Sequence, residues 1–383
     1  MSGGLRGLTW DHPRGYVVLD ALAAATRTAA GPAVRWDRQP LEGFESRPLR
    51  TLADDYDLVV LDHPGLGEAV RDGALRPLDE VLSAAELAAC ADVSAGSSYA
   101  SYRFGGRQWA LPIDAAAQVS VGRPDLLEMR PATWDDARRA AREHRTAVCL
   151  GGPHALLMFS AICVALGASP AAPPAGGVFA DPEAGAEALA IMADLLAHAD
   201  PELAGRNPIA VLDAMAADGG PAYCPLVYGY VTYARPRPGA RALAAFDAPA
   251  GRGGTGSVLG GTGVAVTRSC ADLAAARGLL LRLVSEDTQV GVYRELGGQS
   301  ADRRAWQDAE TDASAGGFYS ATRHTIEQAW VRPRFPGYVE FQAAASAALR
   351  DGLRGGTPGR EILRRVNQLY TRESEAATTR RSG

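Results

Sequence analysis

A short, almost continuous apolar run at residues 57–61 constrains the fold of this chain more than any other feature. A strand buried on both faces has this pattern, which is typical of parallel sheets covered by helices. A polar loop and a helical segment over 67–72 follow the run. Residues 5–10 form a second strand-like segment, followed by a loop and an amphipathic helix over 16–30. The repeated order of strand, loop and helix predicts an α/β fold with a doubly wound sheet.

The length of the chain indicates more than one folding unit. Its 383 residues exceed what one compact core usually holds and suit two lobes. We expect lobe 1 to comprise residues 1–112 and 248–300, and lobe 2 to comprise residues 113–247 and 301–383. The chain is expected to cross between the lobes near 112–116, 246–258 and 300–315.

Composition limits the partners of this protein. The net charge is −5 and no basic stripe is present, which disfavours nucleic acid. The five cysteines are widely spaced and contain no C-x-x-C pair, which disfavours a disulfide framework and a zinc site. The N-terminus shows no signal peptide, and no apolar stretch reaches transmembrane length. The sequence therefore predicts a cytoplasmic monomer with buried thiols and without membrane insertion, metal or cofactor.

The rest of the chain continues to alternate between strand and helix patterns. Thr133 precedes two acidic residues and is predicted to cap a helix. Further helices are expected over 154–166, 182–198, 208–217, 271–284 and 287–296. Further strands are expected over 102–111 (a hairpin), 112–121, 147–150, 222–233 (with a turn) and 258–267. Residues 169–177, 251–256 and 371–383 are expected to be a loop, a flexible stretch and a frayed tail, respectively.

Four stretches resemble the extracellular solute-binding proteins that serve sugar-type ABC transporters. They are G-A-L-R-P-L-D at 73–79, G-R-Q-W-A-L-P at 106–112, R-P-D-L-L with P-A-T-W-D at 123–127 and 131–135, and L-G-G-T-G-V-A-V at 259–266. They keep the family's order and span most of the chain. The resemblance implies the type 2 periplasmic-binding-protein fold: two α/β lobes with a ligand in the cleft between them, and hinge closure on binding. It also implies an ABC permease as a partner if the chain is exported.

Polar loops at strand ends indicate where a ligand would bind, because ligands of open α/β sheets lie beyond the carboxyl ends of the strands. Asp114 follows Pro112 where the family's chain crosses between lobes, so its carboxylate is expected to hydrogen-bond a ligand. Tyr228 and Tyr230 are expected to share one strand face and to contact sugar C–H surfaces. The predicted ligand-binding residues are Trp10, Asp11, His12, Arg14, Tyr16, Asp62, His63, Asp114, Gln118, Tyr228, Tyr230, Gly260 and Gly261.

Each of these residues also has a purely structural interpretation. His12 and His63 each precede a proline and could simply cap the following helices. Asp114 could bond backbone amides at a hinge, and the tyrosines could be ordinary sheet packing. Gly260 and Gly261 could serve a tight crossover instead of approaching a ligand.

Three functions remain open at this point. The first is binding of a small polar solute, either sugar-like or bearing a carboxylate. The second is a cytoplasmic, cofactor-independent lyase, isomerase or cyclase on the same scaffold, with His12 or His63 moving a proton and Asp62 or Asp114 orienting it. Motifs such as GxSxG, HExxH and the P-loop lysine are absent from the sequence, and His12, His63 and Asp62 fall short of a metal site. The third is a sensor that reports a ligand to a protein partner.

Overall fold

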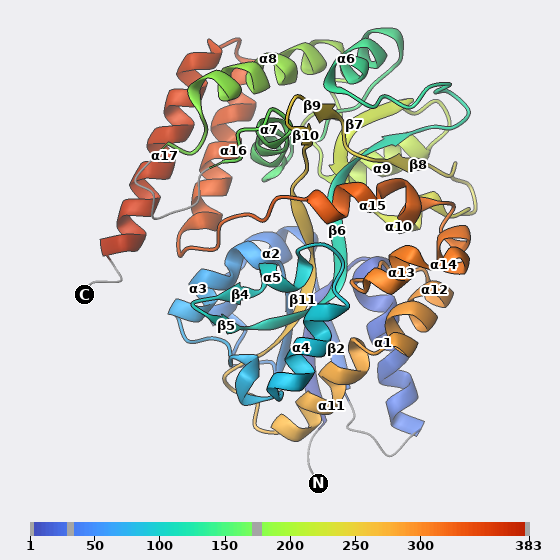
Figure 1. The fold of residues 1–383 in the computed structure, drawn as a ribbon, viewed down its shortest axis with the longest axis vertical. Helices are drawn as coiled ribbons and strands as arrows, with labels where there is room; N and C mark the ends of the chain where they lie inside the picture. The colour runs from blue at the N-terminus through green and yellow to red at the C-terminus, as the bar shows by residue number, and fades with distance from the viewer. Residues whose placement is uncertain (1–3, 29–33, 171–177, 380–383) are drawn as a thin grey trace. The chain divides into compact units, whose positions relative to one another are not determined.

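A computed structural model describes residues 4–28, 34–170 and 178–379. The chain divides into two compact units: unit 1 contains residues 1–116 and 260–315, and unit 2 contains residues 117–259 and 316–383 (Figure 1). The chain therefore passes from one unit to the other at 116/117, 259/260 and 315/316, whereas the sequence placed its lobe boundaries at 112, 247 and 300. The mixture of strands and helices confirms the predicted α/β class.

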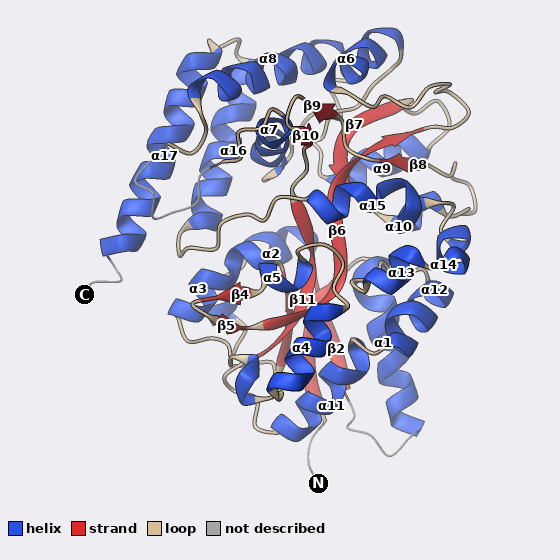
Figure 2. Ribbon diagram, viewed as in Figure 1, coloured by secondary structure: helices blue, strands red, loops and turns tan. Residues whose placement is uncertain are grey.

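Unit 1 is built on a sheet with the strand order β2-β1-β3-β11-β6. Strands β1, β2 and β3 are parallel, whereas β11 runs antiparallel to β3. Helices lie on either side of this sheet in Figure 2. The strands are β1 (Leu5–Trp10), β2 (Val34–Gln39), β3 (Leu58–Leu61), β11 (Leu259–Val266), β6 (Ala110–Gly122, which continues into unit 2) and the hairpin β4 (Arg103–Phe104) with β5 (Arg107–Gln108).

The helices of unit 1 follow the strands as the sequence pattern predicts. All four residues of β3 are buried, as expected for a strand covered on both faces. The helices are α1 (Pro13–Thr28), α2 (Leu41–Ser46), α3 (Leu66–Arg71), α4 (Ala84–Asp92), α5 (Ser98–Ser101), α11 (Leu273–Leu283), the π-helix η4 (Asp287–Val292), α12 (Tyr293–Leu296), α13 (Arg303–Gln307) and α14 (Ala309–Ser314), with 3-10 turns η1 (Leu49–Thr51), η2 (His63–Gly65) and η3 (Leu78–Glu80).

Unit 2 has a smaller sheet and a larger helical part. The second half of β6 pairs with β7 (Tyr223–Tyr228) and with β8 (Ala244–Phe246), both antiparallel. Helices α7, α8, α16 and α17 share one hydrophobic core (Figure 1). The other elements are α6 (Trp134–Glu143), α7 (His154–Ala165), α8 (Pro182–His198), α9 (Pro208–Ala216), α10 (Val231–Ala234), β9 (Ala250–Gly251), β10 (Gly254–Thr255), α15 (Phe318–Gln328), α16 (Tyr338–Arg354) and α17 (Gly359–Thr379).

Several local predictions are confirmed by the structure. The helix over 182–198 has the predicted bounds, since Asp181 caps its first turn and Pro182 occupies the first helical position. Thr133 caps α6 as expected: its hydroxyl accepts from the Asp136 amide, and the Asp136 carboxylate accepts from the Thr133 amide.

Several local predictions differ from the structure. Residues 147–150 form no strand, because Leu150 bonds to the loop residue Ala204 instead of to a continuous ladder. The segment over 222–233 leaves the sheet after Tyr228 and turns into α10. Residues 250–255, which overlap the stretch over 251–256 that was expected to be flexible, form the small ribbon β9–β10.

The predicted frayed tail is helical as far as Thr379. The tail is polar in composition, but it continues α17, whose apolar stripe packs into the core of unit 2. That stripe consists of Ile362, Leu363, Val366, Tyr370 and Ala377. Residues 171–177 of the predicted loop and residues 380–383 of the tail lie outside the described residues.

All five cysteines belong to the described part of the chain and are buried thiols. Burial raises the pKa of Cys163 and of Cys224 to about 12 and that of Cys90 and Cys270 to about 11. Thiols with such pKa values are inert at neutral pH, because the thiolate is the reactive form. The cysteines therefore serve as small packing residues.

Candidate functional site

The carboxyl end of β1 gathers aromatic and charged side chains within unit 1. The Trp10 ring lies against the His12 imidazole, with ring centroids 5.1 Å apart and planes inclined by 7°. Phe44, from α2, stacks on the same indole at 5.8 Å. The loop that carries these residues is fixed by its backbone, since the Asp11 amide donates to the Gln39 carbonyl on β2 at 2.7 Å. The result is a half-exposed imidazole on a rigid aromatic base.

His12 caps the first turn of α1. Its Nδ1 accepts a hydrogen bond from the Arg14 amide at 3.1 Å, and its carbonyl accepts from the Gly15 and Tyr16 amides. Since Nδ1 is an acceptor, the proton of the neutral ring is on Nε2. The capping role considered from the sequence is therefore present.

Arg14 and Asp114 form a buried ion pair beside this aromatic base. Arg14 Nε donates to Asp114 Oδ2 at 2.6 Å, and Nη2 donates to Oδ1. The two side chains are only 4% and 5% exposed, and the guanidinium also lies 5.9 Å from the Trp10 ring centroid. Burial raises the pKa of Asp114, the Arg14 charge opposes that shift, and the Asp62 charge adds to it. Asp114 thus pairs with a side chain, whereas the structural alternative considered from the sequence was a bond to backbone amides.

Tyr16 and Asp11 are held by a second arginine of unit 1. The Arg38 guanidinium lies 3.4 Å from the Tyr16 ring centroid and pairs with Asp20 at 2.5 Å and with Asp11 at 3.7 Å. Such cation–π stacking fixes the ring and leaves its hydroxyl free to turn. Arg38 and Phe44 were not among the predicted site residues, because nothing in the sequence ties β2 and α2 to the end of β1.

Asp62 and His63 lie after β3 in a 3-10 turn. Asp62 caps that turn by accepting from the His63 amide at 2.8 Å, and it also lies 3.1 Å from His63 Nδ1. The His63 side chain is fully buried and faces the Tyr102 ring edge-on, with centroids 6.3 Å apart. His63 is therefore part of the interior of unit 1.

The unit 2 candidates are placed by β6 and β7. Gln118 pairs in register with Tyr228, whose hydroxyl donates to the Leu259 carbonyl at 3.3 Å. His154, at the start of α7, packs edge-on against the Tyr228 ring with centroids 5.8 Å apart. Tyr230 lies beyond the strand and is buried, edge-on to Tyr233. The predicted shared strand face of Tyr228 and Tyr230 is therefore wrong, because β7 ends at Tyr228.

Gly261 has a structural reason to be glycine. Its φ is +98°, which disfavours any other residue, and a Cβ there would lie 2.3 Å from the Asp114 carbonyl oxygen. The close approach of β11 to β6 therefore depends on Gly261, in keeping with the crossover interpretation. Gly260 precedes it and is buried.

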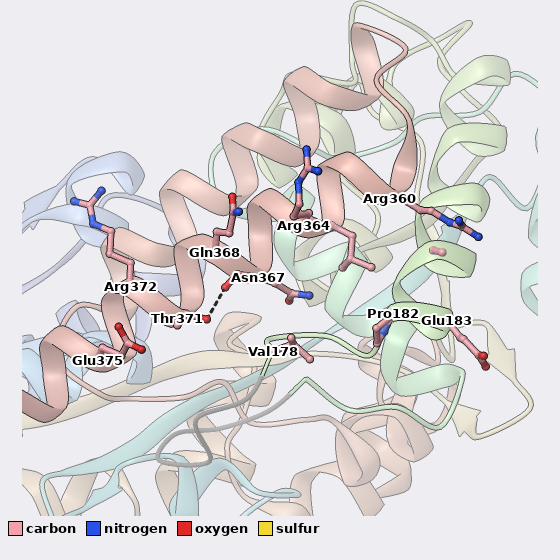
Figure 3. A pocket seen from close by; sticks show the side chains of 12 residues that line it. Val178, Pro182, Glu183, Arg360, Arg364, Asn367, Gln368, Thr371, Arg372 and Glu375 are labelled. Atoms are coloured by element: carbon pink, nitrogen blue, oxygen red, sulfur yellow. Dashed lines mark hydrogen bonds between the residues drawn. The ribbon is translucent and has the colours of Figure 1, made fainter.

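A separate groove of about 940 Å³ lies on unit 2, between α8 and α17 (Figure 3). Val178, Pro182 and Leu363 supply apolar surface. Its labelled arginines, Arg360, Arg364 and Arg372, point in different directions in Figure 3 and do not converge on one position. Among residues 4–28, 34–170 and 178–379, no group of three His, Cys, Asp or Glu side chains could hold a metal ion. No helix in that part of the chain is both long and apolar enough to cross a bilayer.

Residues 11–290 match the family model described as bacterial extracellular solute-binding protein. The chain belongs to this family. No curated protein matches the sequence. The predicted resemblance to solute-binding proteins is thus confirmed. The matched residues include the loops that follow β1 and β3 in unit 1.

Solved structures of other solute-binding proteins share the fold at low sequence identity. Maltose-bound MalE3 of T. maritima is 18% identical with a TM-score of 0.81, over 97% of this chain and 99% of that one. A ribitol complex from Agrobacterium radiobacter K84 is 19% identical with a TM-score of 0.79, over 96% and 97%. A Thermotoga lettingae protein bound to α-D-tagatose is 15% identical with a TM-score of 0.80, over 97% and 100%. These likenesses confirm the solute-binding-protein fold.

Proposed function

We propose that this solute-binding protein binds a neutral, polyhydroxylated solute, a sugar or a polyol, at the carboxyl end of β1 in unit 1. The observation that carries this proposal is the buried Arg14–Asp114 pair beside the Trp10–His12 stack. A buried ion pair contributes little net stability, because the cost of desolvating two charges offsets their attraction. A role in binding a hydroxyl-rich solute would explain why the pair is buried here. Carboxylates accept hydrogen bonds from hydroxyl groups, and guanidinium N–H groups donate hydrogen bonds to hydroxyl groups.

The charges of the site favour a neutral solute over a carboxylate-bearing one. The Arg14 charge is already balanced by Asp114, and the nearby Asp62 adds a negative charge. An anion would therefore meet no uncompensated cation there. The ligands named for the relatives above, maltose, ribitol and α-D-tagatose, are neutral and rich in hydroxyl groups.

Thermal unfolding with a defined panel tests this function. We expect maltose, ribitol, D-mannitol or D-tagatose to raise the Tm, because a ligand at about 100 times its Kd adds roughly 2.7 kcal/mol to the free energy of unfolding. D-gluconate, a polyol that bears a carboxylate, is the matched control and is expected to shift the Tm less. A larger shift with gluconate than with every neutral compound would contradict the proposal.

The partners follow from the same proposal. The solute is the small-molecule partner, and an ABC permease is a second partner if the chain is exported. Family membership supports this pairing. The cytoplasmic location and the monomeric state expected from the sequence stay predictions.

A further inference from the structure

Around Asp114, β6 has β11 as its neighbour on one side, and no strand of the described residues pairs with its other side. Gly261 of β11 approaches the Asp114 carbonyl so closely that no side chain fits between them. The pairing of β6 with β7 begins at Gln118, and that with β8 at Ser120. Carbonyl groups alternate in direction along a strand, so those of Ile113 and Ala115 point away from β11. These two carbonyls need donors from another source, since a buried carbonyl without a partner is costly.

Two buried glutamines supply those donors. Gln289 Nε2 donates to the Ile113 carbonyl at 3.3 Å and to the Leu283 carbonyl at 2.9 Å. Gln299 Nε2 donates to the Ala115 carbonyl at 2.8 Å. The two side chains are 1% and 0% exposed, so water does not compete for these bonds.

The glutamines are themselves held in place. Gln289 belongs to the π-helix η4, a helix type that often marks functional sites. Its Oε1 accepts from the Ser300 hydroxyl and from the Ala301 amide, both at 2.9 Å. This acceptor joins η4 to the segment that carries Gln299. The backbone on both sides of Asp114 is therefore anchored to one network within unit 1.

From this geometry we propose that Gln289 and Gln299 are positioning residues, which fix the geometry of the Arg14–Asp114 pair by holding the backbone around Asp114. This assignment rests on the proposed function, because that function gives the pair a role in solute binding. A bidentate ion pair tolerates little displacement, so a small shift of the strand would open it.

The first test needs no solute. Hydrogen exchange at the Arg14 Nε–H, assigned by its loss in Arg14→Lys, reports how often the pair opens. We expect Gln299→Met, which keeps the volume and removes the donor, to speed this exchange about tenfold, the scale of one lost buried hydrogen bond. Gln108→Met is the matched control, because Gln108 is also buried and donates to a β6 carbonyl, that of Ala110, at 2.8 Å.

The second readout is affinity for whichever of maltose, ribitol, D-mannitol and D-tagatose the wild type binds most tightly. Gln299→Met is expected to weaken it about tenfold, and Gln108→Met less than about twofold. If Gln299→Met does not fold, Gln289→Met carries the same test, since it removes the donor to Ile113 and keeps the volume of the side chain. Unchanged Arg14 exchange, or an equal rise in Gln108→Met, would overturn the assignment. Absence of binding by the wild type would instead contradict the proposed function, and the exchange result would still decide the positioning role.

Discussion

Arg14→Met is expected to lower the free energy of unfolding by about 3–5 kcal/mol at pH 8, because it leaves the Asp114 carboxylate buried without its cation. Adding Asp114→Asn should recover most of this loss, since the double variant buries no charge. Chemical denaturation of the wild type and both variants measures these differences. Arg107→Met is the matched control: Arg107 also pairs with a carboxylate of unit 1, Asp79, but the two side chains are 41% and 46% exposed. Its loss should cost far less stability than Arg14→Met, because water screens an exposed ion pair.

The cost of Arg14→Met should depend on pH in a defined direction. Burial and the Asp62 charge raise the pKa of Asp114 above 3.8, and removing Arg14 takes away the main opposing influence. The folded variant then binds a proton more tightly than the unfolded chain does, so its stability falls as pH rises from about 4 through the folded-state pKa. The difference from the wild type should therefore be smaller at pH 5 than at pH 8. A pH-independent difference, or a loss no larger than that of Arg107→Met, would show that the pair is not a buried charge pair.

His12→Ala is expected to weaken solute binding by about 1–3 kcal/mol, or roughly 5- to 150-fold in Kd. The physical reason is the loss of an imidazole that stacks on Trp10 beside the Arg14–Asp114 pair, where the proposed function places the solute. Titration calorimetry with the tightest ligand of the panel measures the change.

His12→Asn separates the binding role of His12 from its capping role. Asparagine keeps a short acceptor for the first turn of α1 but lacks the reach of Nε2. If His12 binds solute, both variants should lose similar affinity, whereas only His12→Ala should lose helix capping, worth about 1 kcal/mol of stability. Full affinity in His12→Asn would show that His12 acts only as a cap.

The elements of the fold were predictable where local chemistry sets them. The apolar run of β3 and the caps at Thr133 and Asp181 specify their elements without any distant contact. The errors have a different origin. The tail was expected to fray because of its composition, but the apolar stripe of α17 finds a core in unit 2. A strand with a turn was expected over 222–233, but the strand ends at Tyr228 and the chain turns into α10.

The candidate site was predictable only in outline. Strand-end loops identified Trp10, His12 and Arg14, because the carboxyl edge of a sheet is a general ligand site. The pairing of Arg14 with Asp114 joins residues 100 positions apart, and any of the 39 arginines could have been the partner. The burial of His63 could not be predicted either, because its sequence context, Asp-His-Pro, is that of an exposed turn. No feature of the sequence distinguished Gln289 and Gln299, because their role depends on β6 carbonyls that no neighbouring strand pairs.

A crystal structure of the protein with its solute, captured from the panel or from a metabolite extract, tests the central claim most directly. The account predicts a neutral, hydroxyl-rich molecule with a hydroxyl within about 2.5–3.2 Å of Asp114, Arg14 or His12 Nε2. It also predicts that the Arg14–Asp114 pair stays intact beneath the solute. A solute bound with all three of these groups more than about 12 Å away, far beyond hydrogen-bond reach, would contradict it.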